Sequence, residues 1–418
     1  MIVVILLIML TIVLPLVILR SFSFLQKVLV LTIIAGHLGL MFFFHYQLVH
    51  KTNLPVVVDV HRDTQHYYDS TIPFATKPPF SITRTDAINA AGGSKHFGYQ
   101  YVLATLCTIT SHPILAVRLL KTMLFFTGLS CLARVWRRLY GYVLAAKGFA
   151  FMGIVCTPAF YYNYRNLKDG LILALFLFIM ALLDTILPPW RDQLRPMSRK
   201  KSTLAWFTVI ILLYAISTLR LYVIPLIVMA IVMHAIVTSR LGLKQRVALL
   251  VVSALVVVIG FASPVVADIS EMYGKAVRKL IFTPIDIVQG LISPLPWGDI
   301  VREEPGNVAF YSIYWLLLPY ALYTLVRHLR KNINWRLFLY LSTTYVIGVT
   351  VANPARKRLI LYPVLVTWVL AHLAYKQWRR AERLEYESEA GLYEPYYPEY
   401  PGDDFQPEPD KEAALNIV

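Results

Sequence analysis

Long apolar runs recur along almost the whole of this chain and limit the folds that it can adopt. Residues 1–19 read MIVVILLIMLTIVLPLVIL, and similar runs continue to about residue 375. Of the 418 residues, 57% are hydrophobic and only 15% are charged, which is more apolar surface than a soluble domain can bury. Backbone groups in lipid must form hydrogen bonds within their own segment, and runs of this length favour helices over barrel strands. The sequence therefore predicts an all-α, polytopic membrane protein.

The apolar runs predict eleven membrane spans, since roughly 20 apolar residues cross a bilayer. They lie near 1–19, 28–48, 113–133, 141–157, 169–187, 204–218, 222–239, 247–267, 309–326, 337–352 and 359–375. Basic residues cluster in alternate connections, beginning with Arg20 and Lys27 and ending with the group around Arg380. By the positive-inside rule these connections are cytoplasmic, so we expect the N-terminus outside and the C-terminus inside. One of the patches contains Arg336.

The formal charge of +16 would suit a nucleic-acid-binding protein, but its distribution argues against that class. The basic residues form short clusters between spans, which is a topology signal and not a binding face. Cys107, Cys131 and Cys156 show no pairing or metal-ligand spacing. No P-loop, dinucleotide fingerprint, HExxH motif or nucleophile elbow is present, which disfavours ATP-driven transport and hydrolase chemistry.

A polar segment of about sixty residues, 53–111, interrupts the apolar runs. Treating its apolar end, 97–111, as a helix on the outer surface preserves the charge alternation and places the whole loop outside. Asp59, Asp63 and Asp69 lie close together in this loop, among histidines and tyrosines. A carboxylate at a membrane rim can accept a proton from an attacking hydroxyl or hold a divalent cation. The alternative is that these aspartates only solvate an exposed loop.

Charged residues also stand at the predicted outer ends of later spans. Arg165, Lys168 and Asp169 precede the span at 169–187, where charges are costly unless they pair or bind a ligand. Asp169 could bind a ligand or pair with Arg165, four residues earlier. Arg220 lies between two apolar helices, where its planar fork suits a phosphate. Snorkelling of Arg220 to the interface is the alternative.

Other candidate binding residues lie farther along the predicted outer side. Lys95 is in the long loop, and Arg356 and Arg358 belong to an N-P-A-R-K-R cluster before the last span. That cluster opposes the positive-inside rule, and a lipid phosphate would explain why it stands there. Trp297, in S-P-L-P-W, could stack on a sugar or anchor at the headgroups.

The order of these features resembles the GT-C superfamily, the polyprenyl-phosphate-dependent membrane glycosyltransferases. Asp63 stands four residues before Tyr67, the loop ends in K-H-F-G-Y-Q-Y, and the next span opens with Arg118. A later span ends in Pro158 and aromatic residues before the helix led by Asp169. The resemblance covers roughly residues 28–190, with looser support from S-P-L-P-W and R-K-R-L-I-L-Y-P. Many members have adjacent acidic residues in the first loop, whereas Thr64 follows Asp63 here.

The resemblance implies transfer of a sugar from a polyprenyl-phosphate donor to an acceptor hydroxyl, with inversion at the sugar. Asp63 would be the base, with Asp59 in reserve, and Asp169 would orient Asp63 or the acceptor. A divalent cation, Mg²⁺ or Mn²⁺, if one is used, would be held by Asp63 and Asp169. The implied substrate-binding residues are Tyr67, Lys95, Arg165, Lys168, Arg220, Trp297, Arg356 and Arg358.

The expected organisation is an extra span and short cytoplasmic loop (1–27), a GT-C-like catalytic domain (28–380) and a disordered acidic cytoplasmic tail (381–418). The outer loops of the catalytic domain are 49–112 and 268–308, and the protein is expected in the cell (inner) membrane with its site outside. The acceptor would be a glycan, a lipid-linked glycan or a protein. One alternative is an O-antigen or exopolysaccharide polymerase or ligase, although the late outer loop is short for one. Another is a non-enzymatic lipid-linked sugar flippase or assembly scaffold, disfavoured because spans such as 169–187 look almost purely apolar.

Overall fold

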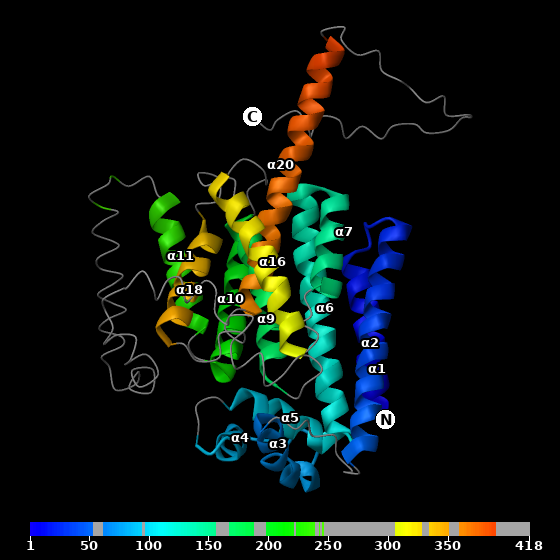
Figure 1. Ribbon diagram of the computed structural model, residues 1–418. Coiled ribbons are helices and arrows are strands. Elements are labelled where there is room, and N and C mark those ends of the chain that lie inside the picture. The colour runs from blue at the N-terminus through cyan, green and yellow to red at the C-terminus, as the bar shows by residue number, and fades with distance from the viewer. Residues whose placement is uncertain are drawn as a thin grey trace.

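The fold is a bundle of long helices with a layer of short helices across one end (Figure 1). This computed structural model describes residues 1–52, 62–93, 97–155, 167–187, 198–220, 223–238, 306–327, 334–350 and 359–389, with Gly242 and Gln245. Within these ranges all regular secondary structure is helical, which confirms the predicted all-α class.

The bundle contains helices from both halves of the chain. They are α1 (Ile2–Ile18), α2 (Phe24–Thr52), α6 (Pro113–Tyr140), α7 (Tyr142–Ala150) with the π-helical turn η2 (Phe151–Val155), α9 (Asp169–Ile186), α10 (Arg199–Leu219), α11 (Val223–Thr238), α16 (Gly306–Arg327), α18 (Trp335–Thr350), and α20 (Tyr362–Glu389) after η4 (Leu359–Leu361). Every predicted span overlaps one of these helices except 247–267, which lies outside the described residues.

Five of the described helices are long and apolar enough to cross a membrane. They contain Phe24–Tyr46, Pro113–Tyr140, Asp169–Ile186, Arg199–Leu219 and Leu359–Ala381. The helix α10 exposes large apolar side chains such as Leu204 and Phe207, which are 66% and 60% exposed, as expected for a face that contacts lipid tails. The chain is therefore a helical membrane protein, and the total of eleven spans stays a prediction.

Close contact between α6 and α9 forms the centre of the bundle. A Cβ atom added to Gly128 of α6 would lie 3.0 Å from the carbonyl oxygen of Ala174 and 3.0 Å from Cβ of Leu177, both in α9. A small residue at this position lets the two backbones approach, which is how helices gain contact in a membrane without a hydrophobic driving force. The position of α9, which bears Asp169 at its start, is thus set by its packing on α6.

The layer across the end of the bundle is built from the predicted outer loop. It consists of α3 (Arg62–Asp69), η1 (Ile72–Thr76), α4 (Arg84–Ala90) and α5 (Gly98–Ile109). The structure places α5, the segment expected as a surface helix, in this layer and not in the bundle (Figure 1). It packs against α4 and also against the ends of α6 and α10, so it joins the layer to the bundle.

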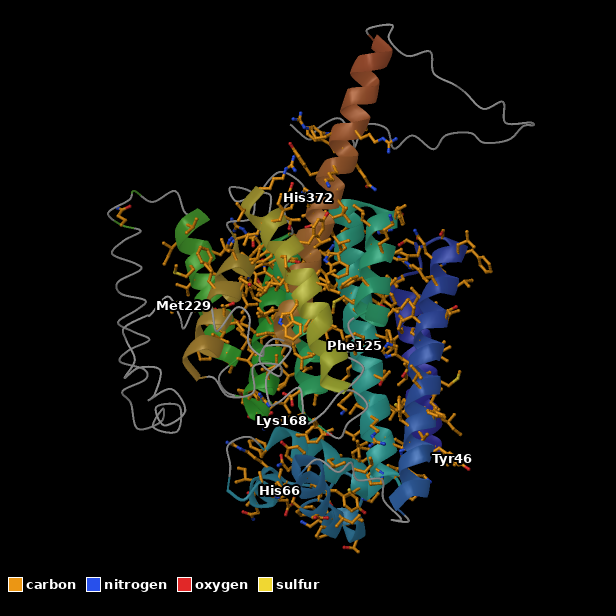
Figure 2. All side chains as sticks on the ribbon, in the orientation of Figure 1. Tyr46, His66, Phe125, Lys168, Met229 and His372 are labelled. Atoms are coloured by element: carbon orange, nitrogen blue, oxygen red, sulfur yellow. The ribbon has the colours of Figure 1, made fainter. Side chains whose placement is uncertain are left out.

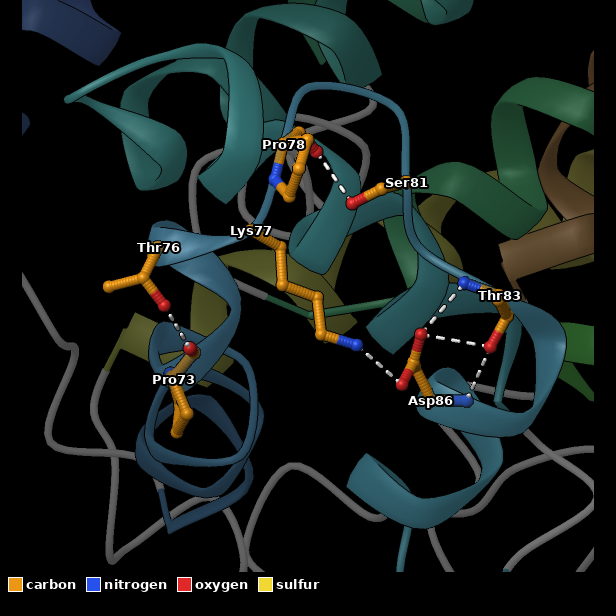
Figure 3. A network of polar contacts seen from close by, with 7 residues as sticks. All are labelled: Pro73, Thr76, Lys77, Pro78, Ser81, Thr83 and Asp86. Carbon is orange, nitrogen blue, oxygen red and sulfur yellow. Dashed lines mark hydrogen bonds and ion pairs between the residues drawn. The ribbon is translucent and has the colours of Figure 1, made fainter.

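A small polar network fixes the connection between η1 and α4 (Figure 3). Thr83 caps α4, and the Asp86 carboxylate accepts hydrogen bonds from the Thr83 backbone and hydroxyl. The ammonium of Lys77 lies 2.7 Å from Asp86 Oδ1. This hydrogen bond from Lys77, together with those from Thr83, lowers the pKa of Asp86 to about 2. The network stabilises this surface connection, and Asp86 is ionised at physiological pH.

A buried ion pair lies near the opposite end of α9, where the sequence did not predict one. Asp184 Oδ2 lies 2.6 Å from Arg336 Nη2, and Arg336 Nε donates to Asp184 Oδ1 at 2.9 Å. The Trp335 indole donates to the same Oδ1 at 3.2 Å. The sequence placed Arg336 in a cytoplasmic basic patch without a partner, whereas in the structure only 1% of its side chain is exposed, because it lies in the first turn of α18, against α9. The presence of Asp184 also weakens the argument from an apolar 169–187 span against a flippase.

The arrangement of the two ends of the bundle allows a test of the predicted topology. The layer lies at the end of the bundle where α1 begins, and α20 projects from the other end (Figure 1). Asp69 in α3 and Lys200 in α10 are exposed, so each can be replaced by cysteine after Cys107, Cys131 and Cys156 are removed. In sealed vesicles, an impermeant maleimide should label the two positions from opposite sides. Labelling of both from the same side would contradict the topology.

Candidate functional site

A cluster of charged side chains lies where the bundle meets the layer, and its centre is an ion pair. Asp169 is the first residue of α9, and Arg220 directly follows α10. Arg220 Nη2 lies 2.8 Å from Asp169 Oδ1, with 13% and 2% of the two side chains exposed. A carboxylate at a helix N-terminus and a cation at a helix C-terminus each complement the helix dipole. The ends of α9 and α10 thus favour both charges at this rim.

The first turns of α6 place two more cations in the same region. Lys121 is fully buried, and its ammonium donates to the carbonyl oxygen of Leu167 at 3.1 Å, two residues before Asp169. Arg118 is also fully buried, and its Nη1 lies 3.0 Å from Nδ1 of His45 in α2. Buried cations in a membrane protein are costly and most often mark ion or substrate sites.

Two tyrosines from the layer cover this cluster. Tyr99 of α5 is fully buried, and its ring centroid lies 5.0 Å from that of Tyr67 in α3. The Lys121 ammonium lies 5.9 Å from the centre of the Tyr99 ring, within range of a cation–π interaction. Burial raises the pKa of the Tyr99 hydroxyl well above its usual value, and Tyr67 adds to this effect. Tyr99 is therefore neutral at physiological pH, and its hydroxyl can donate a hydrogen bond.

Asp63, the predicted base, lies in the first turn of α3, four residues before Tyr67. Residues four apart lie on the same face of a helix. That face of α3 contacts α5 at Tyr67, because Tyr67 is buried against Tyr99. Asp63 therefore precedes by one helical turn the tyrosine that contacts α5, and its side chain is outside the described part of the structure.

The structure brings together several of the residues that the sequence selected. Asp169, Arg220 and Tyr67 belong to one region, and Lys168 precedes α9 at the bundle end that faces the layer (Figure 2). The sequence offered Arg165 as a partner for Asp169, whereas the structure pairs Asp169 with Arg220. The predicted site residues outside the described ranges are Asp59, Lys95, Arg165, Trp297, Arg356 and Arg358.

Sequence reasoning missed Lys121, Tyr99 and His45. Lys121 could have been noticed, because it follows Arg118 by three residues inside an otherwise apolar run, and two cations on one helical face need a common explanation. Tyr99 stands in the K-H-F-G-Y-Q-Y sequence that contributes to the resemblance but was not selected as a site residue, and His45 had no such signal. Tyr99 contacts the cluster because α5 begins beside α6, and His45 because α2 ends there, which no local pattern reveals.

The described residues do not by themselves form a divalent-cation site. In the part of the chain that the structure describes, no group of three or more His, Cys, Asp or Glu side chains is placed to hold a metal ion. Asp169 is the carboxylate described at this junction, and it is engaged by Arg220.

Comparisons with protein-family models, with curated proteins and with solved structures found no match to this chain.

The contact between α5 and α10 yields a prediction about how the layer is held. A Cβ atom added to Gly98 would lie 2.1 Å from Oγ1 and 2.8 Å from Cβ of Thr218, so Gly98→Ala must displace α5. We expect a loss of about 1–3 kcal/mol in unfolding free energy, measured by denaturation in detergent. The added variant Thr218→Gly should restore part of it. Gly36→Ala, with nothing within 4 Å, is the control and should not destabilise.

Proposed function

We propose that this protein is an inverting membrane glycosyltransferase that uses a polyprenyl-phosphate-linked sugar as donor and acts at the rim covered by the α3–α5 layer. The observation that supports it best is the set of ionic side chains buried under that layer. Arg118 and Lys121 are fully buried there, and the partly exposed Arg220 pairs with the buried carboxylate of Asp169. A surface layer over buried cations suits a substrate whose tail lies in the membrane and whose phosphate lies at its edge.

The cations would act on the leaving group. As the bond between the anomeric carbon and the phosphate oxygen breaks, its electron pair and the negative charge pass to the phosphate. Fixed cations in a region shielded from water stabilise such developing charge, which is usually the largest contribution to catalysis. Arg220 suits this role because a planar guanidinium binds phosphate through two parallel hydrogen bonds. Asp169 would hold Arg220 in position through the 2.8 Å ion pair.

The acceptor would be activated from the layer. Its hydroxyl oxygen attacks the anomeric carbon from the side opposite the phosphate, which inverts the configuration there, and its proton passes to the carboxylate of Asp63. Tyr67 and Tyr99 support this assignment, because they connect the helix that bears Asp63 to the cations. Direct displacement requires the base and the leaving-group cations on opposite sides of the sugar. A layer facing a bundle end can provide this arrangement.

The proposed orientation is multi-pass in the cell (inner) membrane, with the layer outside and the end of α20 in the cytoplasm. Its support is the exposed basic residues at the end away from the layer, at helix termini of α6, α10, α16 and along α20. The two ends of the bundle thus differ in the way that the positive-inside rule requires.

The test supplies membranes containing the full chain with a panel of radiolabelled polyprenyl-phosphate sugars and a membrane glycan extract as acceptor. Label should move to the acceptor from at least one of these donors. The same sugars supplied as nucleotide sugars, to membranes free of polyprenyl phosphate, should give no transfer. If no lipid-linked donor yields labelled acceptor, or if nucleotide sugars serve equally well, the proposed function is wrong.

A further inference from the structure

Three arginine–tyrosine pairs stand at the end of the bundle opposite the proposed catalytic site. On α6 and α7, the Arg137 guanidinium lies 4.9 Å from the centre of the Tyr142 ring and donates to its hydroxyl at 2.9 Å. On α16, Arg327 lies 5.8 Å from the Tyr323 ring and donates to its hydroxyl. The third pair is on α20 and is described next. Each pair comes from a different part of the bundle.

The α20 pair lies where this helix leaves the bundle. The Arg379 guanidinium lies 6.0 Å from the centre of the Tyr375 ring, and Trp378 lies 5.9 Å from the same ring. Beyond His372, which is labelled in Figure 2, α20 continues away from the other helices. Trp378 is 47% exposed although it is large and apolar. Such aromatic side chains are typical of the depth at which lipid headgroups meet the hydrocarbon region.

The exposed charges described around these pairs are positive. Exposed basic residues at the same end of the bundle are Arg20, Arg134, Arg138, Arg199, Lys200, Lys201, Lys376 and Arg380. Of the side chains that the structure describes at this end, one is acidic: Asp184, which is buried against Arg336. The α20 sequence becomes acidic from Glu382 onward, farther from the bundle. This end of the bundle therefore presents a positively charged surface at the depth of the lipid headgroups.

We propose that the three pairs bind the phosphates of anionic glycerophospholipids in the leaflet on the α20 side. The contact with the tyrosine limits the motion of each guanidinium, a group that has five N–H donors in a fixed planar fork. A planar guanidinium held at headgroup depth can form two parallel hydrogen bonds to a phosphate. The neighbouring cations favour a headgroup with net negative charge over a zwitterionic one. The proposal is independent of the chemistry at the other rim.

The test measures lipid binding to the purified full chain in a neutral detergent. Phosphatidylglycerol and phosphatidylcholine with identical acyl chains are titrated, and the thermal unfolding midpoint is followed, since a ligand that binds the folded state raises it. Phosphatidylglycerol should raise the midpoint at lower concentration than phosphatidylcholine. In the variant Arg137→Gln/Arg327→Gln/Arg379→Gln, half-maximal stabilisation should need roughly a hundredfold more phosphatidylglycerol, because the charge-assisted hydrogen bonds from the three guanidinium groups to the phosphates are lost.

A second triple variant separates specific sites from general attraction. Arg20→Gln/Arg199→Gln/Lys200→Gln removes the same charge from the same end but leaves the tyrosine pairs intact, and it should retain most of the affinity. Unfolding without added lipid checks that both variants are folded. Equal loss of affinity in the two variants would overturn the proposal, and so would equal binding of the two lipids by the unaltered protein.

Discussion

Asp63→Asn is expected to lower the rate of sugar transfer by about 10²–10⁴-fold, the usual contribution of a general base. Asparagine has nearly the shape of aspartate but cannot accept the proton of the acceptor hydroxyl at neutral pH. The change stands in the first turn of α3, one turn before the Tyr67–Tyr99 contact, so the layer should stay in place. The measurement is the initial rate of label transfer from whichever polyprenyl-phosphate sugar the unaltered protein uses.

Asp69→Asn is the matched control for this prediction. Asp69 is the last residue of the same short helix and is exposed, so its replacement changes the charge of α3 equally. It should leave the rate within about twofold, since surface changes usually have effects below 0.5 kcal/mol. Transfer at the unaltered rate by Asp63→Asn would remove Asp63 as the base. Equal losses in both variants would point to the net charge of the helix and not to a base.

The fold class followed from the sequence because lipid allows few alternatives. A run such as 113–133 must be helical in a bilayer, whatever its neighbours are, and the structure places α6 over it. The composition of 97–111 alone resembles a short span, and only the alternation of basic clusters along the whole chain indicates a surface helix. Contacts between helices that are distant in the sequence could not be predicted from local patterns. The pair of Asp184 with Arg336 joins residues 152 positions apart, and neither residue stands in a motif.

The candidate site was predictable only in part, for a related physical reason. Asp169 and Arg220 could be selected singly, because a charge at the end of an apolar run is costly and needs a cause. That they satisfy each other depends on α9 beginning where α10 ends, a fact of packing and not of sequence pattern. Local pattern suggested Arg165, four residues away, as the partner. Tyr99 became part of the site only because α5 lies across the end of α6.

Arg336→Met is expected to destabilise the protein by about 3–5 kcal/mol, because it leaves the Asp184 carboxylate buried without its cation. Both side chains are at most 1% exposed, so water cannot replace the lost partner. The measurement is the unfolding free energy in mixed micelles at increasing denaturing detergent. Arg134 is an exposed arginine near the C-terminal end of α6, at the same end of the bundle as Arg336. Arg134→Met should change the free energy of unfolding by about 0.5 kcal/mol or less.

The double variant Asp184→Leu/Arg336→Met decides what the ion pair contributes. Two apolar side chains of similar size remove both buried charges, and such replacements are often neutral or stabilising. If the pair only joins α9 to α18, the double variant should recover most of the stability that Arg336→Met loses, with sugar transfer unchanged. A double variant as unstable as the single one would show that the buried charges themselves stabilise the fold, with Trp335 as a further donor to Asp184. Recovery of stability without recovery of transfer would mean that this pair, at the far end of α9 from Asp169, also sets the position of the proposed catalytic rim.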